Sequence, residues 1–290
     1  MIVIINYNGA KYQNDCIKSI KAMDYDNLFT VVVDSNSSDN SIELLKRDYE
    51  DVIVLQQLDN CGVAKGNNIG IKYCLEKNAD YIMLLNNDVV LDKELMIALL
   101  AEADEKTVTV PKIYYYEPNN VIWYAGGEIN WKKGDTIHYG INDMDSMEFD
   151  TEQNVNYAPT CCMLINSKVF GKVGFMDEKV FMYYDDTDFC VRLIENEIGI
   201  KYVPRAKMWH KVSSSVGGQN SKLQVYYMVR NGLYFRHKYK KKFGILSQVY
   251  VNMKNIIKFI IHPFRCPNNV MIIEGYKDYF RGRMGRKEFK

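Results

Sequence analysis

The sequence predicts an α/β protein in which a mixed sheet is flanked by helices and followed by a basic helical C-terminal extension. Through the first hundred residues, short β-branched runs alternate with segments of helical periodicity, which is typical of a parallel sheet covered on both faces. In the last quarter, long stretches of helical periodicity coincide with an excess of positive charge. The chain has 290 residues, 47% of them hydrophobic, so it can bury a core of this kind.

The predicted N-terminal strands are apolar runs at 2–6, 29–34, 51–56 and 81–85. Between the first two strands, Cys16, Ile17 and Ile20 recur at the spacing of one helical face. The next helix opens on SSDNSIE, whose side-chain oxygens suit an N-cap. A third segment of helical periodicity precedes the fourth strand, which completes the alternation.

After Pro111 the pattern changes to short aromatic segments separated by Gly, Pro and Asn, as in hairpins and loops. A buried strand is expected at 160–166. A helix at 185–198 begins with acidic residues and continues with apolar residues at helical spacing. These elements would add an antiparallel portion to the parallel sheet.

The last quarter of the chain is strongly basic. Residues 201–290 contain 20 Lys and Arg against 3 Asp and Glu, a net charge of +17, which leaves residues 1–200 with −16. A long basic helix is predicted at 221–243, and apolar residues from Ile245 to Ile260 then follow a helical stripe. Such a helix either lies in a membrane interface or packs on the domain. The neighbouring charge favours an anionic membrane surface.

Seven cysteines without a CxxC motif indicate reduced thiols in a cytoplasmic protein. No apolar segment approaches the roughly 18 uninterrupted residues of a transmembrane helix. The expected location is therefore cytoplasmic, peripheral at the inner face of the cell membrane.

Polar residues follow three of the four predicted strands, where open parallel sheets bind their ligands. They are Asn6, Tyr7 and Asn8, then Asp34, and then Asn87 and Asp88. The third strand precedes DNCGVAKGNN, in which glycines allow close backbone approach to an anion. This layout predicts a nucleotide pocket. Because neither GxGxxG nor GxxxxGK[ST] is present, dehydrogenase and P-loop functions are disfavoured.

Four residues suggest particular chemistry. The Asp34 carboxylate can accept the N3–H of uracil or thymine. Asp88 suits a hard cation such as Mg²⁺ or Mn²⁺, which prefers oxygen ligands. His210, which precedes a Ser/Gly loop at 213–218, is a candidate second ligand, although a lone histidine is more often structural. The cluster that contains Asp186 either stabilises a helix dipole or supplies a general base, and spacing alone leaves both readings open.

Together these segments resemble the inverting nucleotide-sugar glycosyltransferases of family 2, which have the GT-A fold. The resemblance covers nearly the whole chain and is strongest to bacterial rhamnosyltransferase-type members. Its motifs are VIINYNG, VVVDSNSSDNS, DNCGVAKGNNIG, LLNNDVVL, FMYYDDTDFCVRL, VPRAKMWHKVSSS and YYMVRNGLYF. It implies a catalytic domain over 1–220, with a nucleotide-sugar half at 1–110 and an acceptor half at 111–220, and a helical region at 221–290.

The resemblance also implies roles for individual residues. Asp186 falls on the family's catalytic base, beside Asp185, which stands where the family commonly has Glu. Asp88 and His210 fall on metal-binding positions for Mn²⁺ or Mg²⁺, and NND lacks the first acid of the family's DxD motif. The expected donor-binding residues are Asn6, Tyr7, Asn8, Asp34, Asn60, Gly62, Lys65, Asn67 and Asn87. Candidate acceptor residues are Trp123, Trp131 and Asp188.

The implied reaction moves a sugar from a UDP- or dTDP-sugar, including dTDP-rhamnose, to a hydroxyl of a glycan or lipid-linked acceptor in polysaccharide synthesis. Two other functions remain open: a sugar nucleotidyltransferase and a catalytically inactive nucleotide- or glycan-binding module. A nucleic-acid partner is not expected, because it would explain the basic C-terminal region but not the carboxylates at the strand ends.

Overall fold

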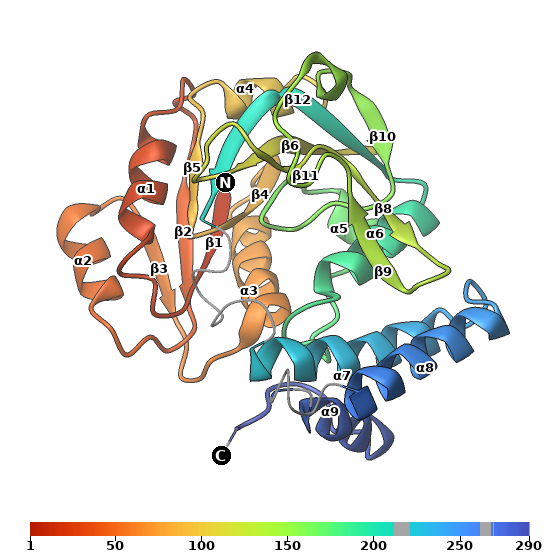
Figure 1. Cartoon of the computed structure of the whole chain (residues 1–290). Helices are drawn as coiled ribbons and strands as arrows, with labels where there is room; N and C mark the ends of the chain where they lie inside the picture. The colour runs from red at the N-terminus through yellow and green to blue at the C-terminus, as the bar shows by residue number, and fades with distance from the viewer. Residues whose placement is uncertain (212–220, 262–267, 269, 290) are drawn as a thin grey trace.

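The protein is described by a computed structural model that covers residues 1–211, 221–261, 268 and 270–289. The Ser/Gly loop predicted at 213–218 lies outside these residues. Figure 1 shows a sheet surrounded by helices, with the last three helices lying together as a separate layer. The α/β class predicted from the alternation of strands and helices is confirmed, and so is the mixed sheet.

The N-terminal half of the sheet is parallel. Strands β1 (Ile2–Asn6), β2 (Thr30–Asp34), β3 (Ile53–Gln56) and β4 (Tyr81–Asn86) pair in the order β4-β1-β2-β3. Helices α1 (Gln13–Lys21), α2 (Ser41–Asp48) and α3 (Gly62–Glu76) connect them. Helix α3 packs on β1, β2 and β4. The β-branched side chains of β2 are buried, as expected for a strand covered on both faces.

The second half of the sheet contains antiparallel pairs. Strand β11 (Cys162–Asn166) runs antiparallel to β4, and beyond it lie β6 (Thr107–Tyr115), β12 (Gly199–His210) and β10 (Gln153–Val155). Strands β5 (Val89–Leu91) and β7 (Ile122–Tyr124) pair with β12 and β6. A separate hairpin consists of β8 (Gly127–Asn130) and β9 (Asp135–His138). Helices α4 (Leu95–Leu100), α5 (Val169–Val173) and α6 (Asp185–Glu195), with the short 3₁₀ helix η1 (Met147–Phe149), complete this part.

Strand β6 was not predicted, because Pro111 lies in its middle and proline lacks the N–H of a central strand. The partner strand β12 accommodates it with an irregularity. Its register shifts between Val203 and Lys207, so that Pro111 lies opposite Val203 and Lys112 lies opposite Lys207. The strand also runs through position 110, where the two halves of the catalytic domain were expected to meet. That division remains a prediction.

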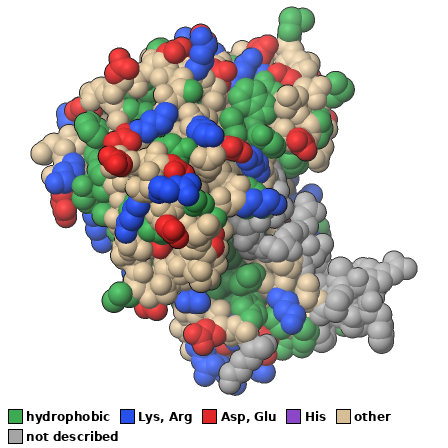
Figure 2. Space-filling model, turned by 90° about the vertical axis from the view of Figure 1, so that its left-hand side faces the viewer, with side chains coloured by type: hydrophobic (Ala, Val, Ile, Leu, Met, Phe, Trp, Pro, Cys, Tyr) green, Lys and Arg blue, Asp and Glu red, His purple; other side chains and the backbone are tan. Residues whose placement is uncertain are grey.

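The C-terminal layer consists of α7 (Lys222–Lys238), α8 (Ile245–Ile261) and α9 (Val270–Phe280). Helix α9 packs on α7, where a Cβ at Gly275 would lie 3.0 Å from a Val229 methyl carbon. The end of α7 joins the main core through Phe235, Tyr239 and Phe243. Figure 2 shows that the face over α1 and α2 carries basic and acidic side chains interspersed rather than a field of one sign.

Candidate active site

A cavity of about 430 Å³ lies between the β8–β9 hairpin, the end of β12 and the start of α6. Its lining includes Trp123, His138, Tyr157, Asp186 and His210. These residues come from parts of the sequence up to 87 positions apart, and the sheet brings them together. Two of the predicted site residues, Asp186 and His210, therefore face the same space.

Asp186 is held at the start of α6 by three hydrogen bonds. The Tyr157 hydroxyl donates to its Oδ2 at 2.8 Å, and Thr187 donates to its Oδ1 from the backbone N–H at 2.6 Å and from the hydroxyl at 3.1 Å. Burial raises the pKa of the Asp186 carboxyl above its usual value, while these donors act in the opposite direction. Such an oriented, partly desolvated carboxylate can accept a proton from a hydroxyl.

The neighbouring Asp185 also lines the cavity and is more deeply buried. Burial raises its pKa, and the negative charges of Asp186 and Asp188 raise it further. The negative charge of one carboxyl therefore disfavours ionisation of the other. The donors from Tyr157 and Thr187 favour the ionised form of Asp186.

Two residues with left-handed backbone conformation precede this pair. Tyr183 and Tyr184 have φ of 61° and 67°, which is costly for residues with a Cβ. Helix α7 holds this turn, because Asn231 Nδ2 donates to the carbonyl oxygens of Met182 at 2.7 Å and Tyr183 at 3.3 Å. The Tyr184 hydroxyl donates to the Gly134 carbonyl oxygen at 2.9 Å. The C-terminal layer thus helps to position the carboxylates.

The Asp88–His210 pair results from strand pairing. Asp88 directly precedes β5, and β5 runs antiparallel to β12 with His210 opposite Val89. This register places His210 Nε2 3.2 Å from Asp88 Oδ1, although 122 positions separate them in the sequence. Both side chains are buried. The Trp123 ring meets His210 edge-on, with centroids 4.8 Å apart.

This pair fits two of the ligands of a divalent cation. Neighbouring ligands of an octahedral ion with bonds of about 2.1 Å lie about 3 Å apart, close to the observed separation. The other ring nitrogen of His210, Nδ1, is buried without a hydrogen-bond partner among the described residues. Among the described residues, no third His, Cys, Asp or Glu joins Asp88 and His210 in a group able to hold an ion. The remaining ligands would have to come from a bound substrate and water.

The strand-end residues of the parallel sheet form a second network. Asn6 Nδ2 donates to Asp34 Oδ1 at 2.9 Å, and Asn87 Nδ2 donates to Asn6 Oδ1 at 2.9 Å. Ser37 donates to both oxygens of Asp34, which is almost fully buried. Gly9 permits this arrangement, because a Cβ there would lie 2.2 Å from Asn6 Oδ1. The Asp34 carboxylate therefore already has three donors in this structure.

The other predicted donor residues lie around this network. Tyr7 is exposed, and Asn8 has a left-handed φ of 53° with its side-chain oxygen accepting from the backbone N–H of Ser38. At the start of α3, Asn60 Oδ1 accepts from the Gly62 N–H at 3.0 Å. Along α3, Asn67 is buried and Lys65 is exposed. Gly62 itself has φ of 72°, and a Cβ there would lie 2.4 Å from the Phe181 carbonyl oxygen.

The structure separates the three candidate acceptor residues. Trp123 lines the catalytic cavity. Trp131 instead packs against Phe235, with ring centroids 6.0 Å apart, and is not part of the cavity lining. The Asp188 carboxylate is buried under Arg192, Lys238 and the Tyr239 hydroxyl.

Sequence reasoning missed two residues of this cavity. Tyr157 donates to Asp186, and its own ring stacks on His138 with centroids 5.6 Å apart. Burial lowers the pKa of His138, so the neutral imidazole is favoured. Tyr157 lies in a loop and His138 ends strand β9, and neither belongs to a motif that distinguished it from ordinary core aromatics.

Comparisons with known proteins identify the class of protein to which this site belongs. The model of the family "Glycosyl transferase family 2" matches residues 1–174, so the chain belongs to this family. It is a nucleotide-sugar-dependent glycosyltransferase, as the motifs predicted. The predicted GT-A fold is likewise confirmed.

The similar proteins include two rhamnosyltransferases and a hexosyltransferase. The dTDP-rhamnosyl transferase RfbF of Shigella flexneri is 29% identical over 239 residues, which are 79% of this chain and 77% of that protein. The low-salt glycan biosynthesis hexosyltransferase Agl10 of Haloferax volcanii is 28% identical over 79% of this chain and 73% of its own length. Rhamnosyltransferase WbbL of Escherichia coli K12 is 24% identical over 58% of this chain and 72% of its own. The resemblance to rhamnosyltransferase-type members is thus confirmed.

Solved structures share the fold at low identity. The structure of GalNAc-T7 with UDP, GalNAc and Mn²⁺ matches 79% of this chain with a TM-score of 0.62 and 15% identity, and this chain spans just 46% of that one. The structure of residues 1–349 of Staphylococcus aureus TarS with UDP matches the whole chain with a TM-score of 0.53 and 14% identity.

Proposed function

We propose that the protein is an inverting glycosyltransferase that moves a sugar from a dTDP- or UDP-sugar to a hydroxyl of a glycan or lipid-linked acceptor. The observation that carries the proposal is the shared cavity, in which Asp186 faces the same space as His210, the partner of Asp88. The names of the Shigella and Escherichia coli relatives support rhamnose as the sugar, with dTDP-rhamnose as the donor.

In this reaction Asp186 removes the proton of the acceptor hydroxyl while the oxygen attacks the anomeric carbon. The new glycosidic bond forms as the bond to the nucleoside diphosphate breaks, and the configuration inverts because the attack comes from the opposite face. Tyr157 and Thr187 hold the carboxylate in position. Asp88 and His210 would bind Mn²⁺ or Mg²⁺, which, when bound, neutralises negative charge on the departing diphosphate.

On the donor side, the Asn6–Asp34–Asn87 network lies at the carboxyl ends of the parallel strands, where nucleotides bind in sheets of this type. Asp34 would read the pyrimidine after its donors rearrange, because in this structure it is nearly buried. Asn60 and Gly62 shape the loop that leads into α3, and Gly62 lies against Phe181 in the segment that precedes α6.

The location that fits this reaction is the inner face of the cell membrane. Residues on the apolar stripe of α8 are exposed in the described part of the chain: Ile245, Leu246 and Ile260 are 81%, 85% and 65% exposed. Exposed Lys240 and Lys241 lie in the segment between α7 and α8. An apolar face beside basic residues matches an anionic lipid surface. No described helix is both long enough and apolar enough to cross a bilayer.

The first experiment measures nucleoside diphosphate release from dTDP- and UDP-sugars, with Mn²⁺ or with chelator. Mixed glycan acceptors are added, and Asp186→Asn is compared with Asp143→Asn, an exposed control carboxylate. Release from one donor that is lost in Asp186→Asn and retained in Asp143→Asn supports the proposal and identifies the sugar. Release that is unchanged in Asp186→Asn, or nucleotide binding without turnover for every acceptor, contradicts it.

Membrane binding is tested separately by sedimentation with phosphatidylglycerol vesicles. Serine replacements of Leu246 and Ile260 together should abolish co-sedimentation. Leu58→Ser, which removes a 94% exposed leucine elsewhere, should leave it unchanged. Equal binding by both variants would show that α8 is not the membrane contact.

A further inference from the structure

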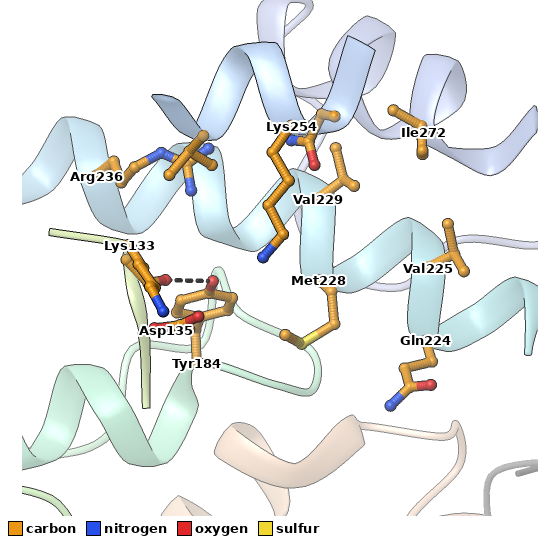
Figure 3. A pocket seen from close by; sticks show the side chains of 13 residues that line it. Lys133, Asp135, Tyr184, Gln224, Val225, Met228, Val229, Arg236, Lys254 and Ile272 are labelled. Carbon is orange, nitrogen blue, oxygen red and sulfur yellow. Dashed lines mark hydrogen bonds between the residues drawn. The ribbon is translucent and has the colours of Figure 1, made fainter. Parts of the chain in front are cut away.

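A second cavity of about 330 Å³ adjoins the catalytic one. It lies between the β8–β9 turn, α7, α8 and α9, and it shares Asp135, Tyr184 and Met228 with the catalytic cavity. Figure 3 shows Lys254 reaching from α8 toward Tyr184, with Lys133 and Asp135 flanking the same space. The two cavities are therefore neighbours around the start of α6.

The second cavity contains a buried basic group that forms no ion pair with a described residue. Arg236, on α7, is 7% exposed, and its Nη2 is buried without a hydrogen-bond partner among the described residues. Arg236 also makes no ion pair with any described residue. The residues that the structure does not describe include no Asp or Glu. A buried, uncompensated guanidinium is costly. Such a group commonly pairs with a ligand that carries an anion.

Charge in the cavity is positive on balance. Lys133 and Lys254 line it together with Arg236, and neither lysine forms an ion pair with a described residue. Among its described lining residues, Asp135 is the acid, and it lies where the cavity meets the catalytic one. Three basic groups against one acid suit a phosphate or diphosphate placed away from the catalytic carboxylates.

A third cavity continues the path outward. It is lined by Trp131, Lys132, Lys242, Leu246 and Tyr250, and it shares Lys133 with the second cavity. Leu246 and Tyr250 belong to the exposed stripe of α8. Shared lining residues thus link the three cavities in a row: the catalytic cavity, the basic cavity and the cavity beside the apolar face of α8.

We propose that Arg236, Lys254 and Lys133 form a binding site for the phosphate or diphosphate group of the acceptor. The acceptor sugar then reaches Asp186 through the adjoining cavity, and an apolar chain attached to the phosphate leaves along α8. This proposal rests on the glycosyltransferase function proposed above and adds the chemical class of its acceptor: a sugar carried on a prenyl-type lipid phosphate.

The test uses the full chain and farnesyl diphosphate as the probe, with farnesol as the uncharged comparison. Binding is measured by calorimetry in chelator with saturating dTDP and UDP, so that the donor site cannot take the diphosphate. Lys254→Ala removes an exposed lysine and is not expected to disturb folding. Arg236→Lys keeps the positive charge but loses the planar guanidinium group, which can donate two parallel hydrogen bonds to a phosphate. Lys18→Ala, which removes an exposed lysine on α1 far from the C-terminal layer, is the matched control, and thermal unfolding reports the folding of every variant.

We expect farnesyl diphosphate to bind wild type and Lys18→Ala alike, and Lys254→Ala at least about tenfold more weakly, the usual effect of losing one charge-assisted hydrogen bond. Arg236→Lys should also weaken binding. Equal binding by Lys254→Ala, Arg236→Lys and wild type overturns the proposal, and so does equal affinity for farnesol. If nucleoside diphosphate release still depends on Asp186 in that case, the proposed transferase function stands without this acceptor site.

Phosphatidylglycerol vesicles distinguish a lipid headgroup from the acceptor. The proposal predicts that Lys254→Ala retains vesicle binding while it loses farnesyl diphosphate. The reverse pattern, with vesicle binding lost and farnesyl diphosphate binding retained, would assign the cavity to bilayer headgroups and overturn the acceptor assignment.

Discussion

The hydrogen bond from Tyr157 to Asp186 makes a quantitative test of the proposed base. Tyr157→Phe removes a donor 2.8 Å from Asp186 Oδ2 and leaves the aromatic ring that stacks on His138. The bond stabilises the charged carboxylate, so it lowers the pKa of Asp186 against the rise caused by burial. Without it, the pKa of Asp186 rises further above its usual value, and less of the carboxylate is deprotonated at neutral pH.

The size of the effect follows from the strength of such bonds. A hydrogen bond to a charged group contributes about 1.5–3 kcal/mol, and one pKa unit corresponds to about 1.4 kcal/mol. The pKa of Asp186 should therefore rise by about one to two units. Because the reaction requires the carboxylate, activity is lost as pH falls through this pKa, and the acidic limb of the profile should move upward by the same amount.

The assay is the pH dependence of nucleoside diphosphate release, followed from pH 5 to pH 9. In Tyr157→Phe, activity should be reduced on the acidic side and recover toward the wild-type rate at high pH. Tyr202→Phe is the matched control, since it removes a buried tyrosine hydroxyl that donates to the Phe149 carbonyl oxygen and does not line the cavity. A uniform loss of rate at every pH, or the same shift in the control, would refute the assignment of Asp186 as the base.

Three further changes have expected outcomes. Asp88→Ala should weaken Mn²⁺ binding, followed by electron paramagnetic resonance with UDP or dTDP present, by at least about tenfold, since it removes a charged ligand; unchanged binding would place the ion elsewhere. Asp185→Asn removes the like charge beside Asp186, so the pKa of Asp186 should fall and the acidic limb should move to lower pH, and a limb that stays in place would contradict their coupling. Gly62→Ala should lower the free energy of unfolding by about 1–3 kcal/mol in urea titrations, through both its φ of 72° and a Cβ 2.4 Å from a carbonyl oxygen. Gly282→Ala, with φ of 68° in a turn and open space around its Cβ, isolates the backbone part, so an equal loss in both variants would exclude the steric contribution.

The sequence alone identified the parallel strands and the polar residues that follow them. β-branched and apolar runs identify β1, β2 and β4, because a buried strand must be apolar along its length, and they also identify the half-buried edge strand β3. The position of Asp88 after such a run places it at the carboxyl edge of the sheet, where ligands bind. Strand β6 was not predicted, because Pro111 argues against a central strand. The irregularity in β12 that accommodates this proline has no local signal in the sequence.

The tertiary structure decided which residues share a site. Strand pairing places His210 against Asp88 across 122 positions, and a loop without any motif brings Tyr157 to Asp186. Packing of α7 leaves Arg236 buried without an ion pair among the described residues, although in the sequence it is one basic residue among many. These contacts depend on register and on helix packing over long sequence separations. Local propensity, which acts within a few residues, carries no information about them.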